Sequence, residues 1–289
     1  MSGGHALRER AETLADLRQI VQAMKNLAFA ELQRLTRMAA PLAQARDSVM
    51  QALRSLDDGA EAASAQDAPA AWLVIGAERG FCGAFNARLA EAAEGRRAVD
   101  PRQRFLLASR RLVDGAGAGW PDAIALPGCA AIDDADAVLE RWMSALEAEA
   151  LRAADVGVLH TDATGVVALR LWPEPQAMAQ AGGDVSPGAA ASLPSPPSPP
   201  MHYLPLPALR QALRRQARAL LLRSALHASL AQENRSRLAQ MERAQDHLDD
   251  LGRALQRLGA SRRQAEITNE LETLMSSFEG AAASASGTL

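Results

Sequence analysis

Two features of this 289-residue chain could carry chemistry: a cysteine that could pair with a histidine, and a turn rich in glycine. Cys82 and His160 each lie near the end of a predicted strand, so a thiolate nucleophile with a histidine base is one interpretation of them. No third residue that would orient the histidine is recognisable. A small buried thiol is the simpler interpretation of Cys82, and we predict no catalytic residue in the chain.

The glycine-rich turn spans residues 76–86 and has the sequence GAERGFCGAFN. A turn of this kind between a strand and a helix could hold a phosphate against its backbone amides. The spacing matches neither G-x-G-x-x-G nor the Walker A pattern, and the turn has no lysine. We therefore expect a tight structural turn in which Gly76, Gly80 and Gly83 allow positive φ, with no nucleotide cofactor. The spacing of His, Cys and carboxylate residues also predicts no metal site.

The charge and composition of the chain exclude several classes of partner. The formal net charge is −3, which is too mild for nucleic acid to be a bulk partner. Residues 210–223 contain five arginines and no acidic residue, which favours either a solvated helix face or contact with an acidic protein surface. Two cysteines make no disulfide framework. No apolar run approaches about 18 residues, so the sequence predicts membrane association only through partners.

The elements that would position these residues begin with a long coiled-coil helix, expected over residues 1–58. Its apolar residues repeat at heptad spacing, which is typical of a coiled coil. Pro41 lies inside the pattern and should kink or locally open the helix. Glu31 is the charged break in the second column. The first column is Leu14, Val21, Ala28, Leu35, Leu42, Val49 and Leu56, and the second is Leu17, Met24, Glu31, Met38, Ala45 and Ala52.

A linker at 59–70 is expected to lead into an α/β module at 71–175. Short apolar runs alternate with helical patterns in this region, which predicts a small, mostly parallel sheet. The expected helices cover residues 85–93, 110–115 and 133–152. The expected strands cover residues 72–75, 105–108, 122–126, 156–160 and 166–172.

A Pro/Ser-rich tether at 176–205 precedes a second coiled-coil helix at 206–279, and a disordered Ala/Ser tail is expected at 280–289. Because long heptad patterns lie at both ends of the chain, we expect the two helices to form an antiparallel coiled coil. The face from Leu14 to Leu35 should then pack on the face from Met241 to Leu258. The first column of the second helix is Leu213, Leu220, His227, Asn234, Met241, Leu248 and Leu255, and the next is Ala244, Leu251, Leu258 and Ala265.

Three motifs, spread in order over nearly the whole chain, resemble those of one known family. Residues 17–28 read LRQIVQAMKNLA, residues 78–86 read ERGFCGAFN, and residues 263–271 read RQAEITNEL. They look like the opening helix, the D-R-G-L-C-G-G-x-N motif and the R-Q-A-x-I-T-x-E-L motif of the gamma subunit of F-type ATP synthases. Glu78, Phe81 and Ala84 depart from the second motif. These departures are typical of a divergent bacterial branch, such as an alternate sodium-linked enzyme, and the coupling ion stays open.

The resemblance implies an antiparallel coiled coil of the terminal helices with a central Rossmann-like α/β module. It implies a central rotor shaft that couples transmembrane ion flow to ATP synthesis or hydrolysis and is not itself catalytic. The implied partners are the alpha and beta subunits of the catalytic ring, the epsilon subunit and the membrane c-ring, on the cytoplasmic side of the bacterial inner membrane. The positions that match family contacts with the catalytic ring are Met24, Lys25, Glu233, Arg237, Arg263, Gln264, Thr268 and Glu270.

Two other functions stay open when the residues are considered without the resemblance. One is a cytosolic coiled-coil scaffold with a vestigial nucleotide-binding-like module. The other is an enzyme that uses Cys82 as its nucleophile. Stable co-purification with a large ATPase complex would distinguish a rotor shaft from both.

Overall fold

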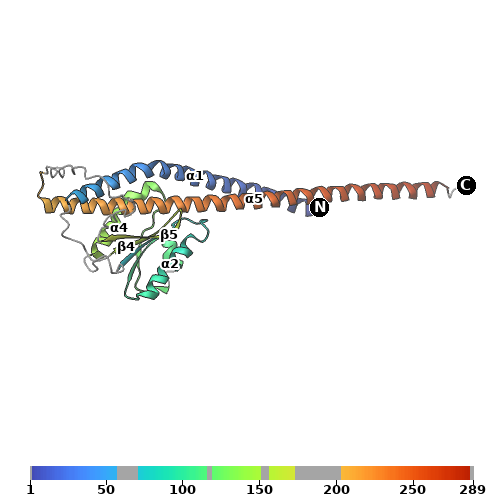
Figure 1. Ribbon diagram of the computed structural model, residues 1–289. Coiled ribbons are helices and arrows are strands. Elements are labelled where there is room, and N and C mark those ends of the chain that lie inside the picture. The colour runs from blue at the N-terminus through green and yellow to red at the C-terminus, as the bar shows by residue number, and fades with distance from the viewer. Residues whose placement is uncertain (1, 57–70, 116–118, 151–155, 173–202, 287–289) are drawn as a thin grey trace, which may run out of the picture. The chain divides into compact units, whose positions relative to one another are not determined.

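The computed structural model describes residues 2–56, 71–115, 119–150, 156–172 and 203–286 (Figure 1). The expected linker at 59–70 and nearly all of the expected tether at 176–205 lie outside these residues. The chain divides into two compact units. One contains Met1–Leu27 and Ala239–Leu289, and the other contains Ala28–Leu238.

Two long helices lie at the ends of the sequence, and the α/β module lies between them in the chain. The helices are α1 (Ser2–Leu56) and α5 (Leu206–Ser286). Helix α5 continues past residue 279, where the sequence predicted its end. The module contains β1 (Ala71–Ile75), α2 (Phe85–Val99), β2 (Arg104–Ala108), α3 (Arg110–Gly115), β3 (Ile124–Leu126), η2 (Ile132–Asp134), α4 (Ala135–Ala150), β4 (Val156–Asp162) and β5 (Gly165–Trp172).

Helix α1 follows the first predicted heptad column and only part of the second. Every residue of the first column is buried or half-buried, whereas Leu17 and Met38 of the second column are exposed. Glu31, the charged residue of that column, is buried at 7% exposure. The helix is continuous through Pro41, so the predicted local opening does not occur.

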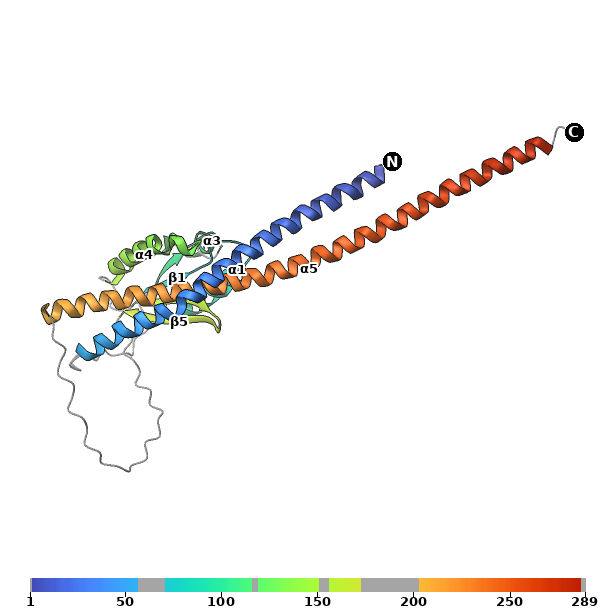
Figure 2. The ribbon, with the colours of Figure 1, turned by 90° about the horizontal axis from the view of Figure 1, so that it is seen from above.

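In the first unit the two helices pair in the predicted antiparallel sense. Arg18 Nη2 lies 2.8 Å from Asp249 Oδ1, and Lys25 Nζ lies 3.6 Å from Glu242 Oε1. The position on α1 rises by seven residues while the position on α5 falls by seven, which is one heptad of an antiparallel pair. Figure 2 shows the two helices from above.

The apolar contact in this unit uses one column of α5. Met241 and Leu248 are buried, at 3% and 8% exposure, whereas Leu251 and Leu258 are 41% and 44% exposed. The prediction that the whole face up to Leu258 would be buried was therefore wrong for the second column. A single neighbouring helix covers one strip of α5, and that strip holds the first column.

In the second unit, the sheet has the strand order β3-β2-β1-β4-β5. Strands β3, β2, β1 and β4 are parallel, and β5 pairs antiparallel with β4. This confirms the mostly parallel sheet, in an order typical of doubly wound α/β folds. The β4–β5 turn is tighter than predicted because Asp162 Oδ1 accepts hydrogen bonds from the backbone N and Oγ1 of Thr164, at 2.7 and 2.6 Å.

Alternate residues of the central strand enter two apolar cores, one on each face of the sheet. Ala71, Leu73 and Ile75 of β1 belong to one core, while Trp72 and Val74 belong to the other. This alternation follows from the period of two in a β-strand. Helices α2 and α3 contribute to the second core through Phe85, Leu89, Ala93 and Leu112.

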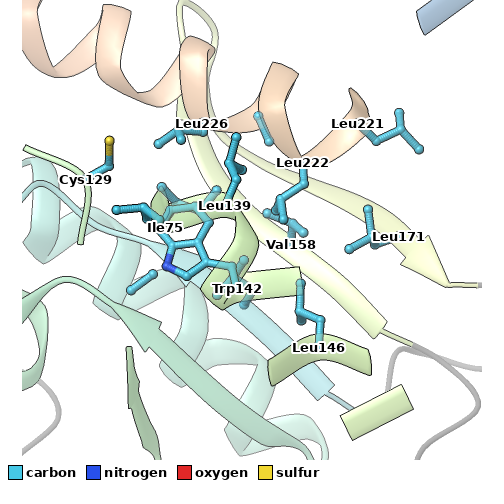
Figure 3. Close-up of a cluster of buried hydrophobic side chains, with 14 of the residues drawn as sticks. Ile75, Cys129, Leu139, Trp142, Leu146, Val158, Leu171, Leu221, Leu222 and Leu226 are labelled. Carbon is cyan, nitrogen blue, oxygen red and sulfur yellow. The ribbon is translucent and has the colours of Figure 1, made fainter. Parts of the chain in front are cut away.

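The first core is shared by the sheet, α4, α5 and one residue of α1. Trp142 of α4 is fully buried beside Leu139, and its Nε1 donates to the carbonyl of Pro127 at 2.8 Å. Figure 3 shows this cluster, with Leu222 of α5 above Val158 of β4. The residues that α1 and α5 add to it include Leu35, Leu221, Leu222, Ala225, Leu226 and Leu230.

The pairing of α1 and α5 in the first unit predicts unequal effects at two leucines of α5. Leu248→Asp should remove about 1.5–3 kcal/mol of apolar burial and add the cost of burying a carboxylate. Leu251→Asp, at an exposed position one turn away, is the matched control and should change stability much less. Urea unfolding of the two full-length variants, followed by circular dichroism, measures the difference. Equal destabilisation by both would contradict the pairing strip described.

Candidate functional site

The glycine-rich turn follows the central strand β1 and is held at its base by the side chains of Asn86 and Ser109. Asn86 Oδ1 accepts from the backbone N of Ala77 at 2.7 Å, and Asn86 Nδ2 donates to the Ala77 carbonyl at 3.0 Å. Ser109 Oγ donates to the same carbonyl at 2.7 Å. A Cβ at Gly76 would lie 2.8 Å from the Ser109 Cβ, so only glycine fits there without a shift. The base of the turn is therefore closely packed.

The tip of the turn contains two left-handed residues. Gly83 has φ of 63°, as the sequence predicted, and Phe81 has φ of 61° although it is not glycine. Phe81 is also 65% exposed. Gly76 and Gly80 do not have positive φ, so the prediction was wrong for them. A bulky residue in the left-handed region is strained, and it persists only where its surroundings hold it.

Four charged side chains meet beside this turn, and we call them the charge cluster: Glu31, Arg79, Glu233 and Arg237. Glu31 Oε1 of α1 accepts from Arg79 Nη1 of the turn at 2.9 Å. Arg237 Nη2 and Glu233 Oε1, one helical turn apart on α5, form a second ion pair. Arg237 Nε also donates to the carbonyl of Gly80 at 3.3 Å. Each of the two long helices thus contacts the turn through a charged side chain.

Three of the four side chains are buried, while that of Arg79 is 32% exposed, and burial changes the proton affinity of Glu233. The side chains of Glu233 and Arg237 are 4% and 5% exposed, and that of Glu31 is 10% exposed. Burial raises the pKa of Glu233 to about 7, against the opposing attraction of Arg237 and Arg79. Arg237 Nη1 also donates to Asn234 Oδ1 at 2.7 Å, which helps satisfy the guanidinium. Asn234 Nδ2 donates to the Leu230 carbonyl at 2.9 Å.

Cys82 and His160 do not make a nucleophile and base. Cys82 lies in the apolar core that includes Phe85, its Sγ is 3.6 Å from the Arg79 carbonyl, and burial raises the pKa of its thiol. A raised pKa disfavours the thiolate that a nucleophile needs. Burial also lowers the pKa of His160, and its Nδ1 is buried with no hydrogen-bond partner in the described part of the chain. The geometry favours the structural interpretation of Cys82.

Two backbone amides beside the base of the turn are bonded to side chains of the chain itself. Ala77 N donates to Asn86, and Arg110 N donates to Glu78 Oε2 at 2.9 Å. Over the residues that the structure describes, no group of three His, Cys, Asp or Glu side chains could hold a metal ion. A cavity of about 470 Å³ lies between α4 and α5, away from the turn, and ion pairs of Arg223 with Asp136 and of Arg215 with Glu147 join its walls.

The residues predicted to contact the catalytic ring divide into three groups by burial: buried, half-buried and exposed. Glu233 and Arg237 are buried among residues of their own chain. Lys25 is half-buried and pairs with Glu242, and Met24 is half-buried beside it. Thr268 Oγ1 donates to the carbonyl of its own helix at Gln264, at 2.9 Å. The exposed members are Arg263, Gln264, Thr268 and Glu270.

The structure adds site residues that the sequence analysis did not assign. Glu31 was recognised only as a break in a heptad column. A charged residue at a coiled-coil core position is a signal for a buried partner, and this signal could have identified it. Asn86 is the last residue of the second motif, whereas Ser109 and Ser229 had no signal in the sequence. Ser229 Oγ of α5 donates to the carbonyl of Ile75, 3.4 Å away at the end of β1.

The sequence and fold of the chain match those of one protein family. The family model described as "ATP synthase" matches residues 4–281. This chain belongs to the gamma-subunit family of the ATP synthases. That membership supports the role of a central rotor shaft and does not favour a cytosolic scaffold. The family is a non-catalytic component of the ATP synthase. No curated protein sequence matches the chain.

Solved rotor structures share the fold at low sequence identity. A rotor chain of the Euglena gracilis mitochondrial ATP synthase is 14% identical, with a TM-score of 0.59, over 92% of this chain and 99% of that one. A chain from a second Euglena gracilis structure, of the OSCP/F1/c-ring, is 16% identical, with a TM-score of 0.61, over 98% and 95%. A central stalk/c-ring chain of Tetrahymena thermophila is 16% identical, with a TM-score of 0.51, over 78% and 99%. Within the described ranges, no helix is long and apolar enough to cross a membrane.

The buried pair on α5 predicts strong coupling between its members. Glu233→Leu should destabilise the chain by about 3–5 kcal/mol, because it leaves the buried Arg237 guanidinium without its charged partner. Arg237→Leu should cost less near pH 7, because Glu233, with its pKa of about 7, can bind a proton. The double variant should lose much less than the sum. Urea unfolding of the full-length wild-type chain, the two single variants and the double variant gives a double-mutant cycle. The control is the exposed Arg235→Leu, which should change the free energy of unfolding little. Additive losses would show that the two charges act independently.

The raised pKa of Glu233 predicts a pH dependence with a definite sign. The folded chain binds this proton more tightly than the unfolded chain, whose carboxyl has its ordinary pKa near 4.5. The stability contributed by Glu233 is therefore full below about 4.5 and falls as the pH rises toward about 7. Relative to Glu233→Gln, the wild-type chain should lose up to about 1.4 kcal/mol per pH unit in this window. A constant difference between the two across the window would contradict the pKa.

Proposed function

We propose that the chain is the gamma subunit of a bacterial F-type ATP synthase and acts as its rotor shaft, coupling transmembrane ion flow to ATP synthesis or hydrolysis. The observation that carries the proposal is the family match over residues 4–281, which includes both long helices and the whole module. The antiparallel pairing of α1 with α5 in the first unit supports a shaft made of two helices. The coupling ion, proton or sodium, is left open.

The proposed partners are the alpha and beta subunits of the catalytic ring, the epsilon subunit and the membrane c-ring. The matched structures support partners of this general kind, because they are described as a rotor, a central stalk/c-ring and an OSCP/F1/c-ring assembly. Large apolar side chains are also exposed near the C-terminal end of α5, and exposed apolar surface of this kind is typical of a protein–protein contact. Those that are 55–65% exposed are Ile267, Leu271, Leu274 and Met275.

The proposed mechanism needs no catalytic group on this chain. ATP chemistry takes place on the catalytic ring, and the shaft changes the affinity of each catalytic site in turn. A shaft can do this only if it binds different states of the ring with different free energy. The two helices present different side chains to their surroundings, and this asymmetry supplies the difference. The chain would lie on the cytoplasmic side of the bacterial plasma membrane as a peripheral protein, attached through its partners.

The exposed polar residues near the end of α5 are the proposed contacts with the ring, together with Met24 and Lys25 on α1. Arg263 and Gln264 can each donate several hydrogen bonds, and Thr268 lies one turn beyond Gln264 on the same face. All are exposed in this chain, as is Glu270. A contact made at one rotary angle should change the rate and the coupling more than the fold.

Removal of this contact predicts a loss of coupled activity in the assembled enzyme. In a reconstituted complex, Gln264→Ala with Thr268→Ala should lower ATP turnover and ion pumping by about ten- to a hundredfold. The reason is the loss of hydrogen bonds to charged groups on the barrier to rotation. The control is Gln256→Ala, an exposed glutamine on the same helix. Normal turnover and pumping in a fully assembled double variant would remove these residues from the mechanism.

A further inference from the structure

We infer that Glu31 and Arg237 are positioning residues that fix the tip of the glycine-rich turn to both long helices, so that force on the tip passes into α1 and α5. The inference rests on the proposed rotor function for its consequence in the enzyme. Its structural part, the restraint of the turn, concerns this chain alone and can be measured without partners.

The two restraints act on Arg79 and Gly80, the two residues that come directly before the exposed residue Phe81. Before it, Arg79 donates to Glu31 of α1, at 2.9 Å. Immediately before it, the carbonyl of Gly80 accepts from Arg237 of α5, at 3.3 Å. Two hydrogen bonds to charged donors, directed to different helices, restrain the tip more than one bond could, because rotation about either bond is blocked by the other.

The apolar cores hold the sheet and anchor the turn at Ala77 and Cys82, but they do not anchor Phe81. Residues of β1 up to Ile75 are buried in the two cores, whereas Phe81 is 65% exposed and adds no apolar anchor. Its backbone has φ of 61°, a strained value for phenylalanine. We expect Phe81 to adopt a more favourable φ when the hydrogen bonds of Arg79 and Gly80 are removed. The charge cluster therefore holds the tip in a conformation that the local sequence does not prefer.

The cluster is also neutral and internally paired, which suits a structural restraint. It has two carboxylates and two guanidinium groups, and each group has a partner within the cluster. Loss of Arg79 leaves the Glu31 carboxylate buried without its partner, and loss of Glu233 does the same to Arg237, which is costly. An exposed pair elsewhere offers a comparison: Arg34 of α1 pairs with Asp133, with side chains 47% and 70% exposed. Solvent screens such a pair, so its loss should have little effect.

The first experiment measures amide hydrogen exchange of residues 78–83 in the isolated full-length chain. Glu31→Gln and Arg79→Gln should each raise the exchange of these amides by about tenfold or more, since each removes a bond to a charged partner. The exchanged pair, Glu31→Arg with Arg79→Glu, should restore protection. Arg34→Gln is the control and should leave these amides unchanged. Unchanged exchange in both single variants would overturn the restraint, as would a folded charge-swap variant without restored protection.

The second experiment measures ATP hydrolysis and ATP-driven ion pumping by the reconstituted complex carrying the same variants. A tip that has lost these hydrogen bonds moves when force acts on it and transmits less of that force to α1 and α5. The number of ions pumped for each ATP should therefore fall several-fold in the single variants and recover in the charge swap. A variant with loosened amides but a normal pumping ratio would overturn the inference. A wild-type chain that assembles no coupled enzyme would instead contradict the proposed function and leave the exchange result standing.

Discussion

The apolar core that the sheet shares with α4 and α5 is the interaction on which the rest of the second unit depends. Leu222, Leu226 and Leu230 of α5 are each at most 4% exposed and belong to one cluster with Trp142 of α4 and Leu73 of β1. Each large aliphatic side chain buried in this way contributes about 1.5–3 kcal/mol. Because this core holds α5 against one face of the sheet, it determines which residues of α5 can reach the turn at the end of β1.

The placement of α5 makes a buried ion pair tolerable beside that turn. Isolated buried charges cost several kcal/mol each, so a pair persists only with good geometry and additional hydrogen bonds. Arg237 has these in Glu233, Asn234 and the Gly80 carbonyl. Glu233 and Arg237, which the sequence analysis matched to family contact positions, therefore serve as internal structure in this chain.

The side chains beside the turn mainly serve the structure of the chain. Cys82 is held as a thiol by burial, and the amide groups at Ala77 and Arg110 are bonded to side chains of the chain itself. Polar residues and large apolar residues near the end of α5 are exposed, and this surface is available to partners. This fits a subunit that acts by the shape and chemistry it presents to other proteins, and not by chemistry of its own.

The sequence by itself determined the parts whose signal is periodic or local. Heptad spacing located both long helices, alternating patterns located the five strands, and the glycines marked a tight turn with positive φ at Gly83. The three motifs also identified the family. Each of these depends on residues that are close in sequence, because the period of a helix or strand is set by its own backbone.

Only the tertiary structure decided which faces of those elements are buried and which charges meet. Leu251 and Leu258 continue a heptad column but are exposed, because one neighbouring helix covers a single strip of α5. Glu31 breaks a column but is buried, because Arg79 reaches it from a turn 48 residues away in sequence. Arg237 resembles a surface residue until the sheet brings the Gly80 carbonyl, 157 residues distant, within hydrogen-bonding range. Such pairings depend on how separate elements pack, and no local period encodes them.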